Sequence, residues 1–129
     1  AFGLQMPLNQ RIFLAQFDAI NKIASEGSCV IVGRCADYVL KDQPDVVRVF
    51  FYASLDARIE RIRRIEGITR DQARELIRKM DKQRRNYYNF FADGNWGLPS
   101  NYDLMVRTDS HRPGDIASAV VAFAREQQI

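Results

Sequence analysis

The stretch GSCVIVGRCADYVL, residues 27–40, places two charges of opposite sign directly after a short apolar run. The run CVIV, residues 29–32, has no polar alternation, which is typical of a strand covered on both faces of a parallel sheet. Gly33 follows it, and glycine lets the backbone turn sharply or a ligand approach closely. Arg34 and Asp37 come next. The stretch therefore predicts a buried strand that ends in a polar turn.

Helices and strands alternate on both sides of this stretch. The predicted elements, in chain order, are a helix over 9–26, the strand 29–32, a short helix over 36–40, a strand over 46–53, helices that begin after Ser54 and Thr69, a strand over 102–108 and a last helix from near Pro113. This order predicts an α/β fold in which helices flank a parallel sheet as three layers. In open parallel sheets, ligands bind beyond the carboxyl ends of the strands, which is where Arg34 and Asp37 are expected.

Positive charge is concentrated in one part of the chain. The net charge is +3, yet residues 58–85 carry eleven Lys or Arg against five Asp or Glu, a local +6 that leaves −3 elsewhere. Arginines three or four positions apart, such as Arg58 and Arg61, share one face of a helix. The cluster favours a polyanion site, because phosphoryl transfer depends on neutralising phosphate oxygens. The alternative is a solvated face with ion pairs along each helix.

The basic segment ends in RRNYYNFF, residues 84–91, where basic and aromatic residues mix. Nucleic-acid-binding proteins stack bases on aromatic rings beside basic side chains. Here the aromatic residues gather at one end of a helix, which favours packing against the edge of the sheet. We therefore favour packing over base stacking for these aromatic residues, and a nucleotide over nucleic acid as the partner.

The composition indicates a single domain over residues 1–129, with 47% hydrophobic residues and no apolar run long enough for a membrane helix. Cys29, Cys35 and the single His111 match no metal-binding spacing, so we expect no metal site and two reduced thiols in a cytoplasmic protein. The sequence contains no G-x-x-x-x-G-K-[ST], the loop that holds the phosphates of a nucleoside triphosphate.

Four segments of the chain, taken together and in this order, match the sequence pattern of a known protein family. They are residues 27–40, VFFYASLDARIERI (49–62), MDKQRRNYYNFF (80–91) and WGLPSNYDLMVRT (96–108). Together they resemble the cytidylate kinase-like family, which comprises nucleoside monophosphate kinases with a P-loop NTPase fold. The resemblance implies transfer of the ATP γ-phosphoryl group, with Mg²⁺, to CMP or dCMP, and a mobile lid over about residues 55–92.

The resemblance implies an acceptor-nucleotide site at the end of the first predicted strand. In the family, a Gly-Arg-Asp sequence follows this strand, where the arginine meets the acceptor phosphate and the aspartate helps to read the cytosine. Gly33 and Arg34 match that pattern directly. Asp37 takes the place of the aspartate if the two residues between, Cys35 and Ala36, are tolerated.

The resemblance also implies phosphate-binding residues in the lid. These are Arg58, Arg61, Lys82, Arg84 and Arg85. The aspartate that would hold the acceptor ribose aligns with Gln83 or shifts to Asp81, which departs from the family pattern.

A second departure concerns the donor site. Family members begin with a strand, a glycine-rich phosphate loop and a helix, and the resemblance of this chain starts after them. We therefore expect a fold that is incomplete at its N-terminal end and a chain that is inactive by itself. Two functions remain open: the acceptor and lid part of a kinase, or a catalytically inactive kinase-like module that binds a nucleotide or nucleic acid.

Overall fold

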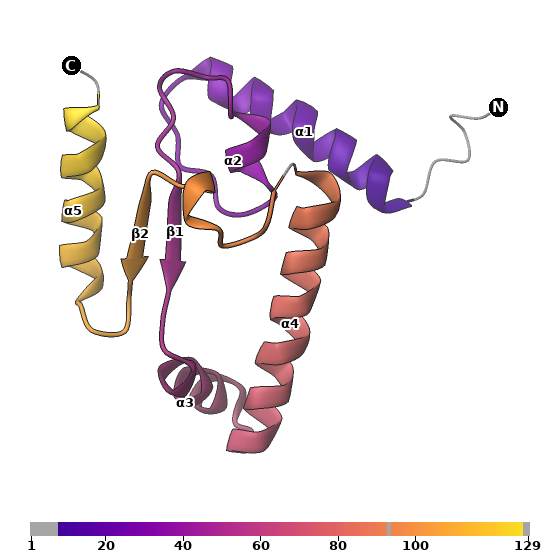
Figure 1. Ribbon diagram of the computed structural model, residues 1–129, viewed down its shortest axis with the longest axis vertical. Helices are drawn as coiled ribbons and strands as arrows, with labels where there is room; N and C mark the ends of the chain where they lie inside the picture. The colour runs from indigo at the N-terminus through magenta and orange to yellow at the C-terminus, as the bar shows by residue number, and fades with distance from the viewer. Residues whose placement is uncertain (1–7, 93, 128–129) are drawn as a thin grey trace.

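A computed structural model describes residues 8–92 and 94–127 (Figure 1). Its elements are α1 (Leu8–Glu26), α2 (Ala36–Val39), β1 (Val49–Tyr52), α3 (Leu55–Glu66), α4 (Arg70–Phe91), the 3-10 helix η2 (Pro99–Asn101), β2 (Leu104–Arg107) and α5 (Pro113–Glu126). The α/β class predicted from the sequence is confirmed. None of the described helices is long and apolar enough to cross a membrane.

The sheet consists of β1 and β2, which are neighbours and run parallel. The register pairs Val49 with Leu104 and Tyr52 with Arg107. Parallel strands need a long crossover between them, and here α3 and α4 provide it. Both strands lie inside the ranges predicted for them, so the parallel sheet is confirmed for these two strands.

The strand predicted over residues 29–32 is wrong. The segment pairs with no described strand, and its Val30 and Val32 are 93% and 87% exposed. A strand is held by ladder hydrogen bonds to a neighbour and by burial of its faces, and the described residues give this segment neither. The three-layer architecture of a P-loop NTPase therefore stays a prediction, because the described sheet has two strands.

Helices α3 and α4 begin after Ser54 and Thr69, as predicted, and local sequence signals explain these starts and the end of α3. Ser54 caps α3, since its Oγ accepts a hydrogen bond from the backbone N–H of Ala57 at 3.2 Å. Gly67 ends that helix with φ of 65°, in the left-handed region that glycine adopts without strain. Thr69 and Gln72 form a reciprocal capping box at the start of α4.

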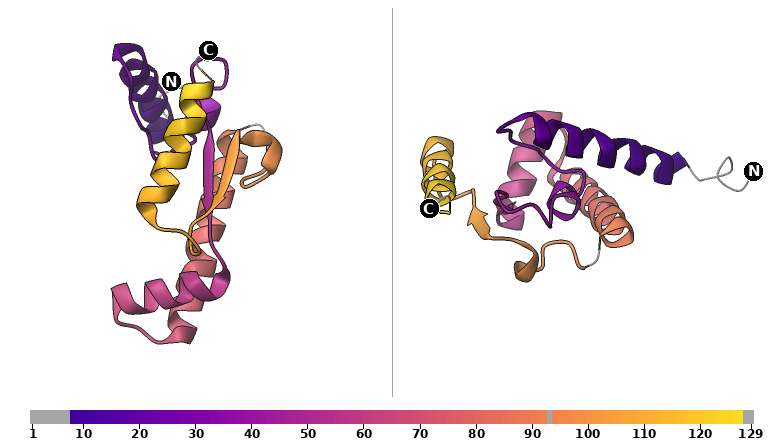
Figure 2. Two further views of the ribbon diagram at one scale, coloured as in Figure 1. Left: turned by 90° about the vertical axis from the view of Figure 1, so that its left-hand side faces the viewer. Right: turned by 90° about the horizontal axis from the view of Figure 1, so that it is seen from above.

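Helix α4 runs from α3 to α1 (Figures 1 and 2) and carries residues of two separate apolar clusters. Near its start, Ala73 and Ile77 pack with Ile59 of α3, and both Ala73 and Ile59 are fully buried. Near its end, Tyr88 packs with Phe13 of α1 and with Cys35.

The packing of the aromatic end of α4 corrects a second expectation. The ring of Phe91 stacks on that of Phe13 with centroids 4.3 Å apart, and Tyr87 contacts the same ring. The aromatic end of α4 thus packs on α1 rather than on the sheet edge. The reason is that α1 offers the aromatic rings of Phe13 and Phe17 there.

Candidate functional site

A run of three left-handed residues forms the turn after the apolar segment. Gly33, Arg34 and Cys35 have φ values of 72°, 61° and 56°. Glycine adopts this conformation freely, but for other residues it costs about 1–2 kcal/mol each. Strained residues of this kind cluster at binding and catalytic sites, where the surrounding structure holds them in place. The turn is therefore the first structural sign of a functional site.

Burial of Cys35 holds this turn in place. Its side chain is 5% exposed and lies in the cluster with Phe13, Tyr88 and Ala92. The backbone N–H of Ala36 donates to the carbonyl of Gly33 at 3.2 Å and closes the turn. Burial, assisted by the charge of Asp37, raises the pKa of the Cys35 thiol to about 11. Cys35 is therefore a packing residue and not a nucleophile at neutral pH.

Asp37 lies in the first turn of α2 and is bound by one side chain. The hydroxyl of Tyr88 donates to its Oδ2 at 2.7 Å, across 51 positions of sequence. Burial first, and then this hydrogen bond to a carboxylate, raise the pKa of Tyr88 well above its usual range. The hydroxyl of Tyr102 interacts with that of Tyr88 and also accepts the backbone N–H of Gly97 at 3.3 Å.

Arg34 is exposed and forms no ion pair with Asp37 or with any other described carboxylate. It does lie close to α4. Burial raises the pKa of Tyr87, and the positive charge of Arg34 opposes that rise. Among the described residues, Arg34 and Asp37 therefore do not neutralise one another in an ion pair, although they lie three positions apart. The guanidinium is available for an anion from outside.

The predicted lid residues divide into paired and unpaired cations. Asp81 accepts from Arg58 at 2.7 Å and from Arg84 at 3.2 Å, and its side chain is only 17% exposed. Asp81, the residue suggested for the acceptor ribose, is thus engaged in joining α3 to α4. Arg61, Lys82 and Arg85 are exposed and form no ion pair with the carboxylates that the structure describes.

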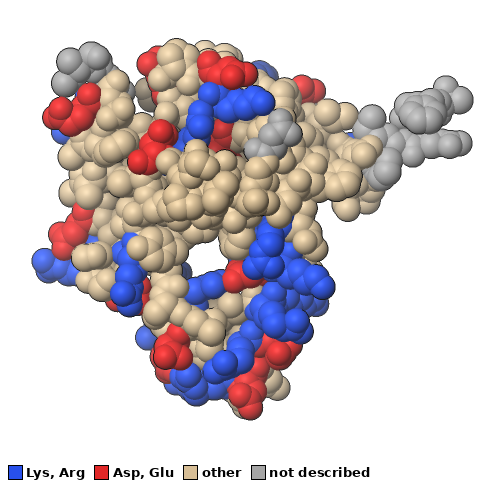
Figure 3. All heavy atoms as spheres, viewed as in Figure 1, with Lys and Arg blue, Asp and Glu red and all other residues tan. Residues whose placement is uncertain are grey.

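On the face shown in Figure 3, Lys and Arg side chains gather over α3 and α4, with Asp and Glu side chains among them. Part of the positive charge is neutralised along the helices, as in the pairs of Arg63 with Glu60 and of Arg78 with Glu75. Such exposed pairs add little stability and leave the net charge of the segment positive. The segment therefore combines solvated ion pairs with cations that have no described carboxylate partner, and a polyanion site here stays a prediction.

Helix α4 sets the distance between the lid residues around Asp81 and the contact of Tyr88 with Asp37. Asp81, Arg84, Arg85 and Tyr88 follow one another at i, i+3, i+4 and i+7, so they share one face of the helix. With a rise of 1.5 Å per residue, Asp81 lies roughly 10 Å along the axis from Tyr88. The same helix thus carries phosphate-binding candidates and the side chain that contacts Asp37.

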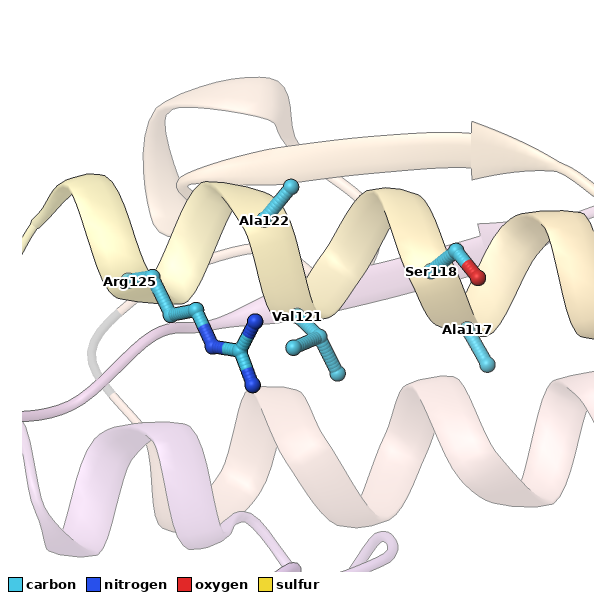
Figure 4. A pocket seen from close by; sticks show the side chains of 5 residues that line it. All are labelled: Ala117, Ser118, Val121, Ala122 and Arg125. Atoms are coloured by element: carbon cyan, nitrogen blue, oxygen red, sulfur yellow. The ribbon is translucent and has the colours of Figure 1, made fainter.

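A hollow of about 310 Å³ lies on α5, away from these residues (Figure 4). It is lined by Ala117, Ser118, Val121, Ala122 and Arg125. Apart from Arg125, this lining offers one hydroxyl and no charge, which is a poor match for a phosphorylated ligand. None of the predicted site residues lines it, so the hollow and the predicted site are distinct.

The fit of the implied Mg²⁺ is tested by the oxygen ligands present. Mg²⁺ is held by carboxylates together with phosphate oxygens and water. Among residues 8–92 and 94–127, no three His, Cys, Asp or Glu side chains are grouped to hold a metal ion. Asp81, which lies among the lid cations, is already paired with Arg58 and Arg84. The described residues offer cations to a phosphate group, but they offer no grouped ligands to a metal ion.

Sequence reasoning missed Tyr88 and Tyr102 as polar members of the site. It treated Tyr88 only as a packing residue, and its ring does pack. No local signal distinguishes a tyrosine that packs from one whose hydroxyl also reaches a carboxylate 51 positions away. The left-handed conformation of Arg34 was equally invisible, since arginine has no preference for it.

Comparison with known proteins defines the class. Residues 1–110 match the model of the cytidylate kinase-like family. The chain belongs to that family. It is 31% identical over 100 residues to a cytidylate kinase from Pyrococcus horikoshii and 32% identical over 100 residues to one from Pyrococcus furiosus, matches that cover 77% of this chain.

These matches cover only part of the length of each relative. The chain spans about half the length of the curated relatives it matches, since the aligned part is 50% of each Pyrococcus protein. A crystal structure of an uncharacterized protein from Eubacterium ventriosum superposes with a TM-score of 0.86 at 29% sequence identity. That match covers 94% of this chain and 69% of the other.

Proposed function

We propose that this chain forms the acceptor and lid part of a nucleoside monophosphate kinase, with CMP or dCMP as acceptor and ATP with Mg²⁺ as donor. The observation that carries the proposal is the left-handed turn, which presents Arg34, a residue with no ion pair to any described carboxylate, beside Asp37. A planar guanidinium binds a phosphate with two parallel hydrogen bonds. A carboxylate accepts from the amine of a base. These two groups suit the two ends of a nucleotide.

The roles of the lid residues follow from their charge. Arg61, Lys82 and Arg85 would contact the transferring phosphoryl group, because they are exposed and have no described carboxylate partner. Arg58 and Arg84 share Asp81, so reaching a phosphate would require them to exchange that carboxylate for it. The named relatives are cytidylate kinases, which supports the choice of CMP.

The test is ADP formation by the protein at its natural length. With ATP and Mg²⁺, CMP or dCMP should be phosphorylated faster than UMP, AMP or GMP, and Arg34→Ala should lower the rate at least tenfold, since it removes a charged hydrogen-bond donor. No ADP formation with any nucleoside monophosphate would contradict the proposal. The 129-residue chain is expected to bind CMP without turning it over.

A second candidate function is a catalytically inactive module that binds a nucleotide or nucleic acid. It is favoured by the absence of G-x-x-x-x-G-K-[ST] from these 129 residues and by the net +6 of residues 58–85. Salt separates the two functions, because binding to nucleic acid weakens steeply as salt rises. Tight, salt-sensitive binding of single-stranded RNA with no preference among nucleotides would favour the module.

A further inference from the structure

The two oxygens of the Asp37 carboxylate have different surroundings. Oδ2 accepts the hydroxyl proton of Tyr88 at 2.7 Å. Among the described residues, none donates to Oδ1, and the side chain is only half-buried. A carboxylate is planar, so a bond that fixes one oxygen also fixes the direction in which the other accepts. Among the described residues, Oδ1 of Asp37 is therefore left without a donor, and it points in a fixed direction beside the turn.

Tyr88 is itself held firmly enough to aim that acceptor. It is 7% exposed, and its ring lies in the cluster with Phe13, Cys35 and Ala92. Its oxygen interacts with Tyr102, whose hydroxyl in turn accepts from the backbone of Gly97. Chains of hydrogen bonds of this kind strengthen one another away from water.

We propose that Tyr88 is a positioning residue that sets the base selectivity of the acceptor site, by holding Asp37 so that Oδ1 accepts from an exocyclic amine. This inference rests on the proposed function, because it assumes that a nucleotide base reaches Asp37. It assigns Tyr88 no contact with the ligand. Tyr88 acts through Asp37 alone.

The chemistry of the two pyrimidines makes the proposal specific. Cytosine carries an amine at C4, which donates, whereas uracil carries a carbonyl at the same place, which only accepts. A fixed carboxylate oxygen therefore favours CMP and repels UMP. A carboxylate that rotates freely can turn away from the carbonyl, so it discriminates less. The phosphate contact through Arg34 does not depend on this orientation.

Tyr88 lies on the same helix as the lid cations Lys82, Arg84 and Arg85. Arg85 precedes Tyr88 by three residues, about 4.5 Å along the helix axis, and lies on the same face. One rigid helix therefore carries a phosphate-binding candidate and the group that aims the base reader.

The test compares the affinities of the 129-residue chain for CMP, UMP and ribose 5-phosphate by calorimetry, in the wild type and in Tyr88→Phe. The ratio of CMP to UMP affinity should fall by about tenfold in Tyr88→Phe, the size of effect expected for a hydrogen bond to a charged group. The affinity for ribose 5-phosphate should not change. A loss of folding alone would lower all three affinities together.

Tyr87→Phe is the matched control. The hydroxyl of Tyr87 donates to Oε1 of Gln16 at 2.9 Å, so this neighbouring substitution also removes one hydrogen bond from the same turn of α4. It leaves Asp37 untouched, and the CMP to UMP ratio should stay at the wild-type value. Tyr102→Phe keeps Tyr88 in place but weakens its support, so it should lower the ratio in the same direction by a smaller factor.

The outcomes separate the inference from the function on which it rests. An unchanged CMP to UMP ratio in both Tyr88→Phe and Tyr102→Phe overturns the role of Tyr88 and leaves the acceptor site standing. An equal fall of the ratio in Tyr87→Phe also overturns it. If the wild type binds neither CMP nor ribose 5-phosphate, the acceptor site itself fails, and the inference fails with it.

Discussion

Arg34 adopts a strained backbone conformation that no described contact of its side chain explains. It is exposed, forms no described ion pair and still adopts a left-handed backbone next to left-handed Gly33 and Cys35. Burial explains Cys35, which anchors the turn, but it does not explain Arg34. A residue that is strained and exposed is more easily understood as a binding residue than as a structural one.

Arg34→Gly should therefore stabilise the chain while removing nucleotide binding. Glycine relieves the left-handed strain, so the free energy of unfolding in urea should rise by up to about 1 kcal/mol. Arg34→Ala also removes the guanidinium but keeps the left-handed strain. It should therefore bind the nucleotide no better than Arg34→Gly does, and it should be no more stable than the wild type. A loss of stability in Arg34→Gly would mean that the guanidinium supports the fold.

The two cysteines should differ sharply in reactivity. Cys29 is exposed, whereas Cys35 is buried with a pKa raised to about 11. At pH 8, a thiol with that pKa is thiolate to roughly one part in a thousand, and the thiolate is the reactive form. A disulfide reagent should label one cysteine per chain quickly and the second only after unfolding. Two equally fast cysteines would contradict the buried position of Cys35.

At the scale of elements, α4 is the central piece of the molecule. Its first half packs on α3 through Ala73 and Ile77, and its second half packs on α1 and reaches Asp37 through Tyr88. Asp81 lies between these halves and joins α3 to α4 through Arg58. Changes at Asp81 should therefore affect the packing of α3 on α4.

Asp81→Asn should lower the free energy of unfolding by about 1–2 kcal/mol, because it removes two charge-assisted hydrogen bonds from a largely buried carboxylate. Glu75→Gln is the control. It breaks the exposed i, i+3 pair with Arg78 on the same helix, which should cost less than about 0.5 kcal/mol. Equal effects of the two substitutions on urea unfolding would show that Asp81 is an ordinary surface residue.

The elements also show what sequence reasoning can reach. The caps at Ser54 and Thr69 were predictable because the signal and the structure lie within one turn of helix. The segment 29–32 was misjudged because a strand depends on a neighbour, which its own residues cannot reveal. Among the site residues, the resemblance pointed to Arg34 and Asp37. The resemblance did not predict the contact of Asp37 with Tyr88, because that contact joins segments that are distant in the sequence.

The whole molecule has a thin core for its length. Nine hydrophobic residues of the described chain are buried, and more large hydrophobic side chains than that are exposed. The exposed ones include Val30 and Val32 in the unpaired segment and Phe51 in β1. Buried contacts are therefore concentrated in two small clusters, and stability should be uneven along the chain.

Amide hydrogen exchange should report this uneven stability. The amides of Val30 and Val32 make no backbone hydrogen bond to a described residue, so they should exchange at close to the rate of an unfolded chain. The amide of Ile77, within α4 and in a buried cluster, should exchange far more slowly. Protection of Val30 equal to that of Ile77 would indicate that the segment is part of a sheet.

The central claim, that the turn at residues 33–37 binds an acceptor nucleotide, is tested most directly by titrating the ¹⁵N-labelled chain with CMP. The account predicts that the backbone signals of Gly33, Arg34 and Asp37 shift in a saturable way, and that Arg34→Ala abolishes the shifts while the rest of the spectrum is kept. CMP that leaves these three signals unmoved, or that binds Arg34→Ala as tightly as the wild type, would contradict the account.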